Sequence, residues 1–577
     1  MSWIWFTGIW TYPLLVGFMY LAIPSVASDF GIPQIVQILL IYVFPLVMPI
    51  TITWTNIERK QRGQTDFSFK AVYGGFTNKN EKLSKEYIAR AYPDVNPKFC
   101  KKIPQGIAIG RHKGKYICCP LDKDATMCSI YGSPGSGKTT TMLSFLMGGL
   151  WQSELATKAK VDPARPYNFF LVDLKCELWK KLLFIEKESD YRAAEHPEFQ
   201  VFQPSNRQSF GWDVFYRLKE ENVTESEKIK LVSDLSDILI ETKEEGDYFS
   251  ANAKRLLQGI MLFYVYQKWE FIDIIQKITR TDLFELLDEI VPVAEQLELG
   301  VVLDKVASFR GKQDNESIAD IHSTLCQNLS IFSYPDIIYA LRDNPYRTSP
   351  AVLNDGKTHL DFAIEDALLS PYRILFRMVV MQILQHAEAV FTETEDRRTL
   401  LILDEFARCG FIPDIQNSMA LLRSKKTSII LITQNQAQLK NIYKEDLSQA
   451  MLDLCELKVF LSGTSDKDTS DLVSRLAGEY DITKLSYGRK GIMRSKSDEH
   501  YSSERRAIVE PSDLQTLRER NEAIIFLFGN YARVAKLQYF NDKLLTPLWK
   551  EKQAAAAAKL KHKAQAQANE PTKKETE

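Results

Sequence analysis

A glycine-rich stretch early in the chain has the residue types and the spacing of a phosphate-binding loop. Residues 132–139 read GSPGSGKT and fit the pattern G-x-x-x-x-G-K-[S/T]. Glycines let the backbone wrap around phosphates, while the N–H groups at the start of the next helix point toward them. We therefore expect Lys138 to reach the β- and γ-phosphates of a nucleotide and Thr139 to hold Mg²⁺ through its hydroxyl. The residues expected to bind the nucleotide are Gly132, Ser133, Pro134, Gly135, Ser136, Gly137, Lys138, Thr139 and Thr140.

Two adjacent carboxylates are the second candidate for chemistry. In the stretch LLILDEF, an apolar run, 400–403, ends in Asp404 and Glu405. Such a run is typical of a buried parallel strand. A carboxylate pair at the end of that strand suits a Mg²⁺ ligand, Asp404, and a residue that polarises the attacking water, Glu405. The alternative is a strand-end aspartate that caps the next helix.

A glutamine and an arginine further along the chain are weaker candidates. Residues 427–435 predict another buried strand, which ends at Gln434. Ligands of open parallel sheets sit at the carboxyl ends of the strands, so Gln434 is a candidate to sense the γ-phosphate or to orient water. The alternative is a polar strand end. Arg423, just before this strand, is either a surface charge or an arginine finger that reaches a neighbouring subunit's nucleotide, and the local sequence slightly favours the surface charge.

The elements that position these residues follow from the apolar patterns. Residues 125–131 predict a short buried strand and residues 140–150 a helix, which is the strand–loop–helix setting that the phosphate loop requires. Residues 168–174 predict another buried strand. From 217 to 342 the apolar spacing is helical, and strands resume near 400. This order predicts one nucleotide-binding α/β domain that is interrupted by a helical insertion.

Composition limits the class of protein. A chain of 577 residues is too long for one ordinary core, so two or three folded units are expected. The formal net charge of −1 excludes a basic character of the whole chain, although it allows a local basic surface. The eight cysteines are scattered and form no C-x-x-C pair, which indicates reduced thiols in a cytosolic body.

The N-terminal stretch 1–57 predicts a membrane anchor. Its only charged side chain is Asp29, and residues 3–23 and 35–54 are apolar runs, each about long enough to cross a bilayer. Basic residues follow the second run at Arg59, Lys60 and Arg62, and positive charge stays on the cytoplasmic side. We therefore expect two spans in the lipid bilayer, with both termini and the body of the chain in the cytoplasm.

Two polar segments near the C-terminus have no clear chemistry. Residues 486–506 predict a solvated loop or hairpin, with a nucleic-acid contact as the less favoured interpretation. The tail from residue 553 is rich in Ala, Lys and Gln and has little to bury. It predicts a short exposed helix, disorder, or a docking segment for a partner.

Several segments, taken in their order along the chain, resemble one known family. They read GSPGSGKTT, VDLKCE, LILDEFARCG, RSKKTSIILITQNQAQL and ERRAIVEPSDLQTL. In these segments the chain resembles the type IV secretion coupling proteins, the TraG/TraD family of conjugation ATPases. The resemblance covers roughly residues 1–550. The phosphate loop is shared by many ATPases, whereas LDEF followed by LITQNQAQL is much more diagnostic.

The resemblance implies a homo-hexameric RecA-like motor at the bacterial inner membrane, with ATP and Mg²⁺ as cofactors. Such a motor delivers relaxase–DNA complexes or protein effectors to the subunits of a type IV secretion channel. Single- or double-stranded DNA would be contacted through its phosphates without sequence readout. The resemblance also favours the finger role for Arg423 and the γ-phosphate role for Gln434.

The predicted fold class is α/β: a RecA-like P-loop nucleotide-binding domain with an inserted all-α domain, preceded by a two-helix transmembrane anchor. The expected parts are residues 1–57 as the transmembrane hairpin, 58–216 and 343–550 as the nucleotide-binding domain, 217–342 as the all-α insertion and 551–577 as an exposed tail.

The chain departs from the family pattern at two places. The family often has D-x-K-G-E, where this chain has Cys176 in place of the glycine, and it often has W-N-P-L, where this chain keeps Trp212 but has Asp213 and Val214. Two other functions stay open. One is a membrane-tethered DNA translocase of the FtsK/HerA kind, and the other is an ATP-gated receptor for protein effectors only.

Overall fold

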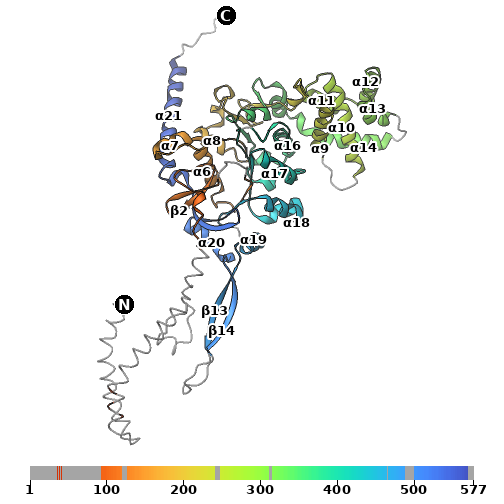
Figure 1. Cartoon of the computed structure of the whole chain (residues 1–577). Helices are drawn as coiled ribbons and strands as arrows, with labels where there is room; N and C mark the ends of the chain where they lie inside the picture. The colour runs from red at the N-terminus through yellow and green to blue at the C-terminus, as the bar shows by residue number, and fades with distance from the viewer. Residues whose placement is uncertain are drawn as a thin grey trace. The chain divides into compact units, whose positions relative to one another are not determined.

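A twelve-stranded sheet is the largest element of the computed structural model of this chain (Figure 1). The structure describes residues 92–119, 126–240, 247–310, 315–394, 396–463, 466–487 and 499–569, together with residues 36, 38 and 41. The chain divides into two units. The larger unit comprises Val95–Ala477 and Val509–Glu577 and contains the sheet, and the smaller unit comprises Met1–Asp94 and Gly478–Ile508.

Seven neighbouring strands of this sheet are parallel. In sheet order they are β12 (Leu457–Phe460), β4 (Cys128–Tyr131), β11 (Thr427–Thr433), β10 (Thr399–Leu403), β5 (Asn168–Asp173), β9 (His359–Ala363) and β6 (Phe199–Phe202). Most of their residues are buried, as expected for parallel strands that are covered on both faces. The prediction of an α/β fold with a parallel sheet is confirmed.

The other five strands extend the sheet in antiparallel fashion. They are β15 (Glu522–Leu527), β16 (Asn530–Lys536), β2 (Ile107–His112), β3 (Lys115–Cys119) and β1 (Cys100–Lys101). The pairing of β15 with β12 brings the C-terminal strands close to β4, although several hundred positions separate them along the chain. The end of β16 consequently lies beside the loop that follows β4.

The strand registers place the candidate residues at one edge of the sheet. Leu403 at the end of β10 is paired with Leu431 of β11, and Thr433 at the end of β11 is paired with Tyr131 at the end of β4. Because these strands are parallel, the segments that follow them leave the sheet at the same edge. The phosphate loop, Asp404–Glu405 and Gln434 all lie in these segments.

Helices cover both faces of the parallel strands. On one face, Ile130, Ile402 and Ile430 share a hydrophobic core with α6 and α8, and on the other face Tyr131 and Leu431 pack beside α18. The helices of the larger unit that lie outside the helical group between β6 and β9 include α6 (Lys138–Leu150), α7 (Gln152–Ala159), α8 (Leu178–Leu183), α16 (Arg373–Val390), α17 (Ile415–Ser424), α18 (Gln436–Leu454), α19 (Lys467–Ala477) and α20 (Pro511–Arg520). Alternate residues of one strand thus serve two cores.

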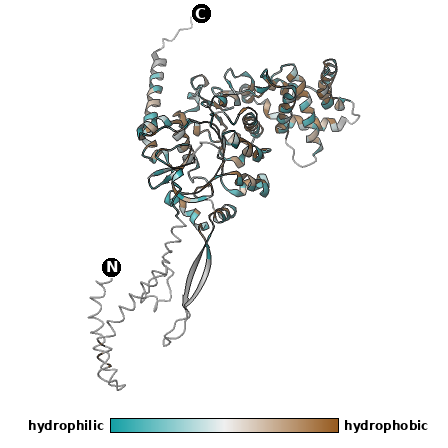
Figure 2. Ribbon diagram, viewed as in Figure 1, coloured by the Kyte–Doolittle hydropathy of each residue, from teal (hydrophilic) through white to brown (hydrophobic). Residues whose placement is uncertain are grey.

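A group of helices lies between β6 and β9 in the sequence. It contains α9 (Glu225–Leu239), α10 (Tyr248–Tyr266), α11 (Phe271–Arg280), α12 (Leu283–Gln296), α13 (Gly300–Arg310), α14 (Asn315–Leu329) and α15 (Pro335–Ile338), and a π-helical turn, Tyr339–Asp343, follows. Thr224 and Glu227 form a capping box at the start of α9, which satisfies two free N–H groups. Hydrophobic and hydrophilic residues occur on the same helices, as expected for helices that bury one face (Figure 2).

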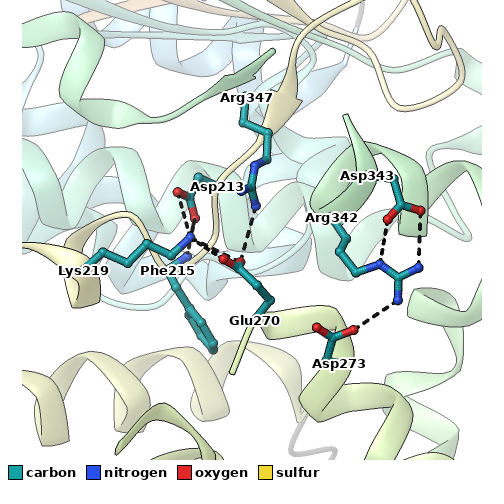
Figure 3. A network of polar contacts seen from close by, with 8 residues as sticks. All are labelled: Asp213, Phe215, Lys219, Glu270, Asp273, Arg342, Asp343 and Arg347. Atoms are coloured by element: carbon teal, nitrogen blue, oxygen red, sulfur yellow. Dashed lines mark hydrogen bonds and ion pairs between the residues drawn. The ribbon is translucent and has the colours of Figure 1, made fainter. Parts of the chain in front are cut away.

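A network of charged side chains links the segment by which the chain enters this helical group to the segment by which it leaves (Figure 3). The group is entered after β7 (Gly211–Trp212) and left before β8 (Arg347–Thr348), and these two short strands pair with each other. Lys219 Nζ lies 3.1 Å from Asp213 Oδ1 and 2.9 Å from Glu270 Oε1, while Arg347 Nη1 lies 3.3 Å from Glu270 Oε2. Asp213, one of the departures from the family pattern, therefore ties the entry of the helical group to α11.

The smaller unit contains a hairpin of β13 (Glu479–Tyr487) and β14 (Glu499–Ala507). The sequence predicts a loop or hairpin over 486–506; the structure shows a hairpin there, but its first strand begins earlier, at Glu479. The chain continues near its end into α21 (Leu545–Asn569). This helix corresponds to the first of the alternatives for the tail.

The predicted membrane anchor is not seen in the structure. Apart from residues 36, 38 and 41, both predicted spans, 3–23 and 35–54, lie outside the described residues. Among the residues that are described, no helix combines the length and the apolar character that a bilayer crossing needs. This finding contradicts the predicted location in the bacterial inner membrane on two spans, which depended on the hydropathy of the stretch 1–57, on the basic residues that follow it and on the family resemblance.

Candidate active site

The phosphate loop connects β4 to α6 and depends on its glycines. Gly137 precedes the helix with φ of 99°, a backbone conformation that side chains with a Cβ disfavour. A Cβ at Gly132 would lie 2.3 Å from Ser136 Oγ and 3.0 Å from Leu461 Cβ, so a larger residue would force these neighbours to shift. The Gly132 N–H donates to the carbonyl of Thr433, 3.2 Å away, and this bond joins the loop to the end of β11.

Lys138 is the first residue of α6, and its side chain is buried with a carboxylate. Lys138 Nζ lies 3.1 Å from Glu405 Oε1, and both side chains are less than one tenth exposed. The two residues are separated by 267 positions in the sequence, so the sheet alone brings them together. A buried cation needs such a partner, because desolvation without one is costly. Phosphates that bind at this loop would therefore compete with Glu405 for Lys138.

Gln434 is the third side chain of a row of contacts, Lys138–Glu405–Gln434, whose members come from the segments that follow three adjacent strands, β4, β10 and β11. Its Nε2 donates to Glu405 Oε2 at 3.1 Å, and its Oε1 accepts from Gln438 Nε2 at 3.4 Å. Glu405 itself has φ of 49°, which is uncommon for a residue other than glycine and costs on the order of 1–3 kcal/mol. Such strain indicates that the surrounding structure holds this carboxylate in a defined position.

Asp404 lies next to Glu405 in surroundings that disfavour the ionised form of its carboxyl group. Burial, together with the negative charges of Glu405 and Asp173, raises the pKa of Asp404 to about 7. Its Oδ1 accepts the N–H of Glu405 at 3.0 Å. Asp173, at the end of β5, also has a raised pKa because of burial, although it accepts N–H groups of Lys175 and Leu178.

These buried acids fit a divalent cation. Asp404 and Glu405 place two carboxylates at the end of β10, and the charge of Lys138 offsets only part of their negative charge. Mg²⁺ prefers oxygen ligands, usually with one or two carboxylates and substrate phosphates. Thr139, the second residue of α6, is half-buried beside the loop and offers a hydroxyl. Thr139 and Asp404 are therefore the residues that could hold Mg²⁺.

Arg423 is the one predicted residue that the structure does not bring to this site within one chain. Its Nη1 lies 2.5 Å from Glu456 Oε1, and Glu456 Oε2 accepts the N–H of Met127 at 3.2 Å. Met127 precedes β4, whereas the phosphate loop follows it, so Arg423 lies at the opposite edge of the sheet. Its side chain is 47% exposed, which leaves it accessible to another molecule.

The structure places two cationic side chains beside the loop that the sequence analysis did not predict. Lys536, the last residue of β16, donates from Nζ to the carbonyl of Ser136 at 3.0 Å. A Cβ at Gly135 would lie 3.7 Å from Nη2 of Arg518, a residue of α20. Neither residue belongs to a motif, and 400 positions separate Lys536 from Ser136. Lys536 reaches the loop through the place of β16 in the sheet and Arg518 through the packing of α20, and neither arrangement can be predicted from local sequence.

Cys176 occupies the position of the family's glycine in the turn after β5. Its φ is 51°, the left-handed conformation that glycine would adopt without strain, and the residue is buried. Burial raises the pKa of its thiol above the ordinary value. The turn therefore holds a residue with a Cβ in a backbone conformation that glycine adopts more readily.

Comparison with known proteins identifies relatives. A family model described as "Type IV secretory system Conjugative DNA transfer" matches residues 168–576. The type IV secretion system-coupling protein VirD4 of Bartonella henselae is 21% identical over 374 residues, which are 62% of this chain and 57% of the relative. The conjugal transfer protein TraG of Rhizobium radiobacter is 26% identical over 296 residues, 49% of this chain and 44% of the relative. The chain thus spans about half the length of these two relatives.

Solved structures of a coupling protein share the fold. TrwB in complex with ADP and Mg²⁺ has a TM-score of 0.55 and 15% sequence identity, and the match covers 78% of this chain and 93% of TrwB. The unbound monoclinic form of the bacterial conjugative coupling protein TrwBdeltaN70 has the same TM-score and identity, over 76% of this chain and 90% of that one. At this identity the likeness shows a common fold.

Proposed function

We propose that this chain, which belongs to the type IV secretory system conjugative DNA-transfer family, hydrolyses ATP in order to pass cargo to a secretion channel. The named relatives support this proposal, because they are described as coupling and conjugal transfer proteins. The cargo that we propose is DNA bound to a relaxase, or a protein effector. DNA would be contacted through its phosphates without sequence readout.

One observation carries the proposal: Lys138, Glu405 and Gln434 form a continuous chain of contacts at the ends of adjacent parallel strands. Phosphoryl transfer to water needs a cation for the phosphates, a group that polarises the water and a group that orients it. We assign these roles to Lys138, Glu405 and Gln434 in that order. The cradle formed by residues 132–140 would hold the phosphates through its N–H groups.

Bound Mg²⁺ would neutralise charge on the phosphates and so favour attack by water. Thr139 and Asp404 would hold it. Glu405 is then free to accept a proton from the water, because Lys138 moves its contact from the carboxylate to the phosphates. Gln434, which donates to Glu405 in this structure, would keep the carboxylate pointed toward the water.

The proposed division of labour follows the elements. Residues 58–216 and 343–550 would bind and hydrolyse the nucleotide, and the all-α part, 217–342, would meet cargo. The charge network at Lys219 and Glu270 supports this division, because it holds the helical part at both of its connections.

The experiment that tests this function is the ATPase rate of the 577-residue chain, measured with and without single- and double-stranded DNA across a range of protein concentrations. We expect DNA to stimulate the rate several-fold and the rate per subunit to rise cooperatively with concentration. A rate that is independent of both would contradict a DNA motor and would favour a receptor for protein effectors.

We further propose that the chain assembles as a hexamer in which Arg423 serves the nucleotide of the neighbouring subunit. The position of Arg423 at the opposite edge of the sheet supports a role in trans, since it cannot serve its own site. Mixing Arg423→Ala subunits with Glu405→Gln subunits should then restore part of the ATPase activity. At an equal ratio, about one quarter of the interfaces in a ring of head-to-tail contacts regain both groups.

The control for this mixing experiment combines Glu405→Gln subunits with Lys138→Ala subunits. Both residues belong to the same half of the site, so no interface regains a complete set and no activity should return. Equal recovery in the two mixtures, or no recovery with Arg423→Ala at any ratio, would exclude a trans-acting Arg423.

A further inference from the structure

Two cations from the C-terminal strands lie against the phosphate loop. Lys536 Nζ, at the end of β16, donates to the Ser136 carbonyl at 3.0 Å and lies 3.9 Å from the position of a Cβ at Gly137. The Arg518 guanidinium, from the last turn of α20, lies 3.7 Å from the position of a Cβ at Gly135. Both side chains thus reach the glycines of the loop from the same chain.

No carboxylate of the described residues forms an ion pair with either of these two cationic side chains. Partial burial of Lys536, together with the nearby positive charge of Arg518, lowers the pKa of Lys536. Two like charges brought together in this way repel each other, so their proximity is unfavourable unless an anion joins them.

The same two elements offer an internal comparison. Earlier in both elements, Arg533 of β16 pairs with Asp513 of α20, with 3.0 Å between Nη2 and Oδ2. That contact between β16 and α20 is neutral, as expected for a structural ion pair. The contact at the phosphate loop instead brings together Lys536 and Arg518, and Lys138 of the same loop is already neutralised by Glu405. The positive charge available to an incoming anion is therefore that of Lys536 and Arg518.

A purely structural role does not account for both residues. Lys536 could serve as a tether of the loop, because its hydrogen bond to the Ser136 carbonyl holds the backbone. One such bond uses a single donor of the ammonium group, which has three. A role of Lys536 as a tether would also leave the nearby, exposed Arg518 without a function. The geometry therefore suits a polyanion that accepts hydrogen bonds from both side chains.

We propose that Arg518 and Lys536 bind the phosphate chain of the nucleotide, supplied in cis by α20 and β16. This inference rests on the proposed function, because it takes the loop as a nucleotide site. Arg518 is a binding residue, and Lys536 both binds and positions the loop. In the nucleotide-free chain, Lys138 stays with Glu405 while Arg518 and Lys536 attract the phosphates. Bound phosphates then link the C-terminal segment to the loop.

The test measures equilibrium binding of ATP, ADP and inorganic triphosphate to the 577-residue chain and to its variants. Arg518→Gln should raise the Kd for ATP by roughly 10-fold or more, as expected for a lost hydrogen bond to a charged group. Arg518→Lys should retain most of the affinity, because it keeps the charge. Lys536→Arg should also bind better than Lys536→Gln. Arg520→Gln, which removes the same charge a little further along the chain, should bind ATP within about twofold of the parent chain.

Thermal unfolding separates binding from a structural role. Without nucleotide, Arg518→Gln should have an unchanged or higher Tm, because it removes a like-charge repulsion. The rise in Tm that ATP causes in the parent chain should shrink in this variant. A lower Tm without nucleotide that Arg518→Lys does not restore would show a structural role and overturn the proposal.

Failure of this inference and failure of the proposed function give different results. If Arg518→Gln and Lys536→Gln bind ATP as the parent chain does, while Lys138→Ala does not, the two cations have no role at the phosphates and the nucleotide site stands. If the parent chain itself binds no ATP, the proposed function fails, and this inference fails with it.

Discussion

Lys138→Ala is expected to abolish ATP hydrolysis, with kcat falling by about 10²- to 10³-fold or more. The substitution removes the cation that we place at the β- and γ-phosphates, where charge develops during transfer. It also leaves Glu405 buried without the partner that now lies 3.1 Å away. Phosphate release per subunit, measured at saturating ATP, checks the prediction.

The loss of a buried partner needs its own control. Breaking a buried ion pair on one side costs about 3–5 kcal/mol, so Lys138→Ala alone could lose activity by unfolding. The double variant Lys138→Ala/Glu405→Gln removes both charges and should fold more stably while staying inactive. Lys277→Ala, which removes a lysine that pairs with Glu289 at 2.7 Å in the helical group, should keep its basal activity. Normal turnover in a folded Lys138→Ala protein would refute the assignment of the phosphate loop.

Glu405→Gln is expected to separate binding from hydrolysis. The variant keeps the shape of the side chain and can still accept a hydrogen bond from Gln434, but it cannot take a proton from water. Loss of a general base typically lowers the rate by about 10²- to 10⁴-fold, so kcat should fall by at least about 10²-fold. ATP should bind as tightly as before or more tightly, because a carboxylate no longer competes for Lys138.

The chain offers a matched control for this substitution. Glu188 accepts from Lys180 Nζ at 2.8 Å and from Gln203 Nε2 at 2.9 Å, which are the same two types of partner that Glu405 has. Glu188→Gln should leave kcat and ATP affinity near the parent values, since it lies outside the strand ends that form the site. A kcat of Glu405→Gln within about threefold of the parent would remove Glu405 from the mechanism.

The sequence could predict the parts of the site that depend on neighbouring residues. The phosphate loop could be recognised because its glycines and its lysine are close together in the sequence, between a predicted strand and a predicted helix. Asp404, Glu405 and Gln434 could be named as candidates because each follows a short apolar run of the kind that is typical of a buried strand. The α/β class followed from the same runs.

The membrane anchor shows the limit of local hydropathy. Two apolar runs predicted two spans, but the helices of the described part of the chain contain no segment that could cross a bilayer. The runs lie almost wholly outside the described residues, so that prediction depended on the apolar composition of the N-terminal stretch, on the basic residues that follow it and on the family resemblance.

By itself, the sequence indicated which residues are candidates to bind phosphates and which strands end in acids or amides, because these properties depend on short-range spacing. Only the tertiary structure decided which of them meet. The order of the strands places Lys138 beside Glu405, although 267 positions separate them. Arg423 lies at the opposite edge of the sheet, and Lys536 and Arg518 lie beside the loop. These contacts depend on how distant strands pair, and that pairing is set by the packing of the whole sheet rather than by any local pattern.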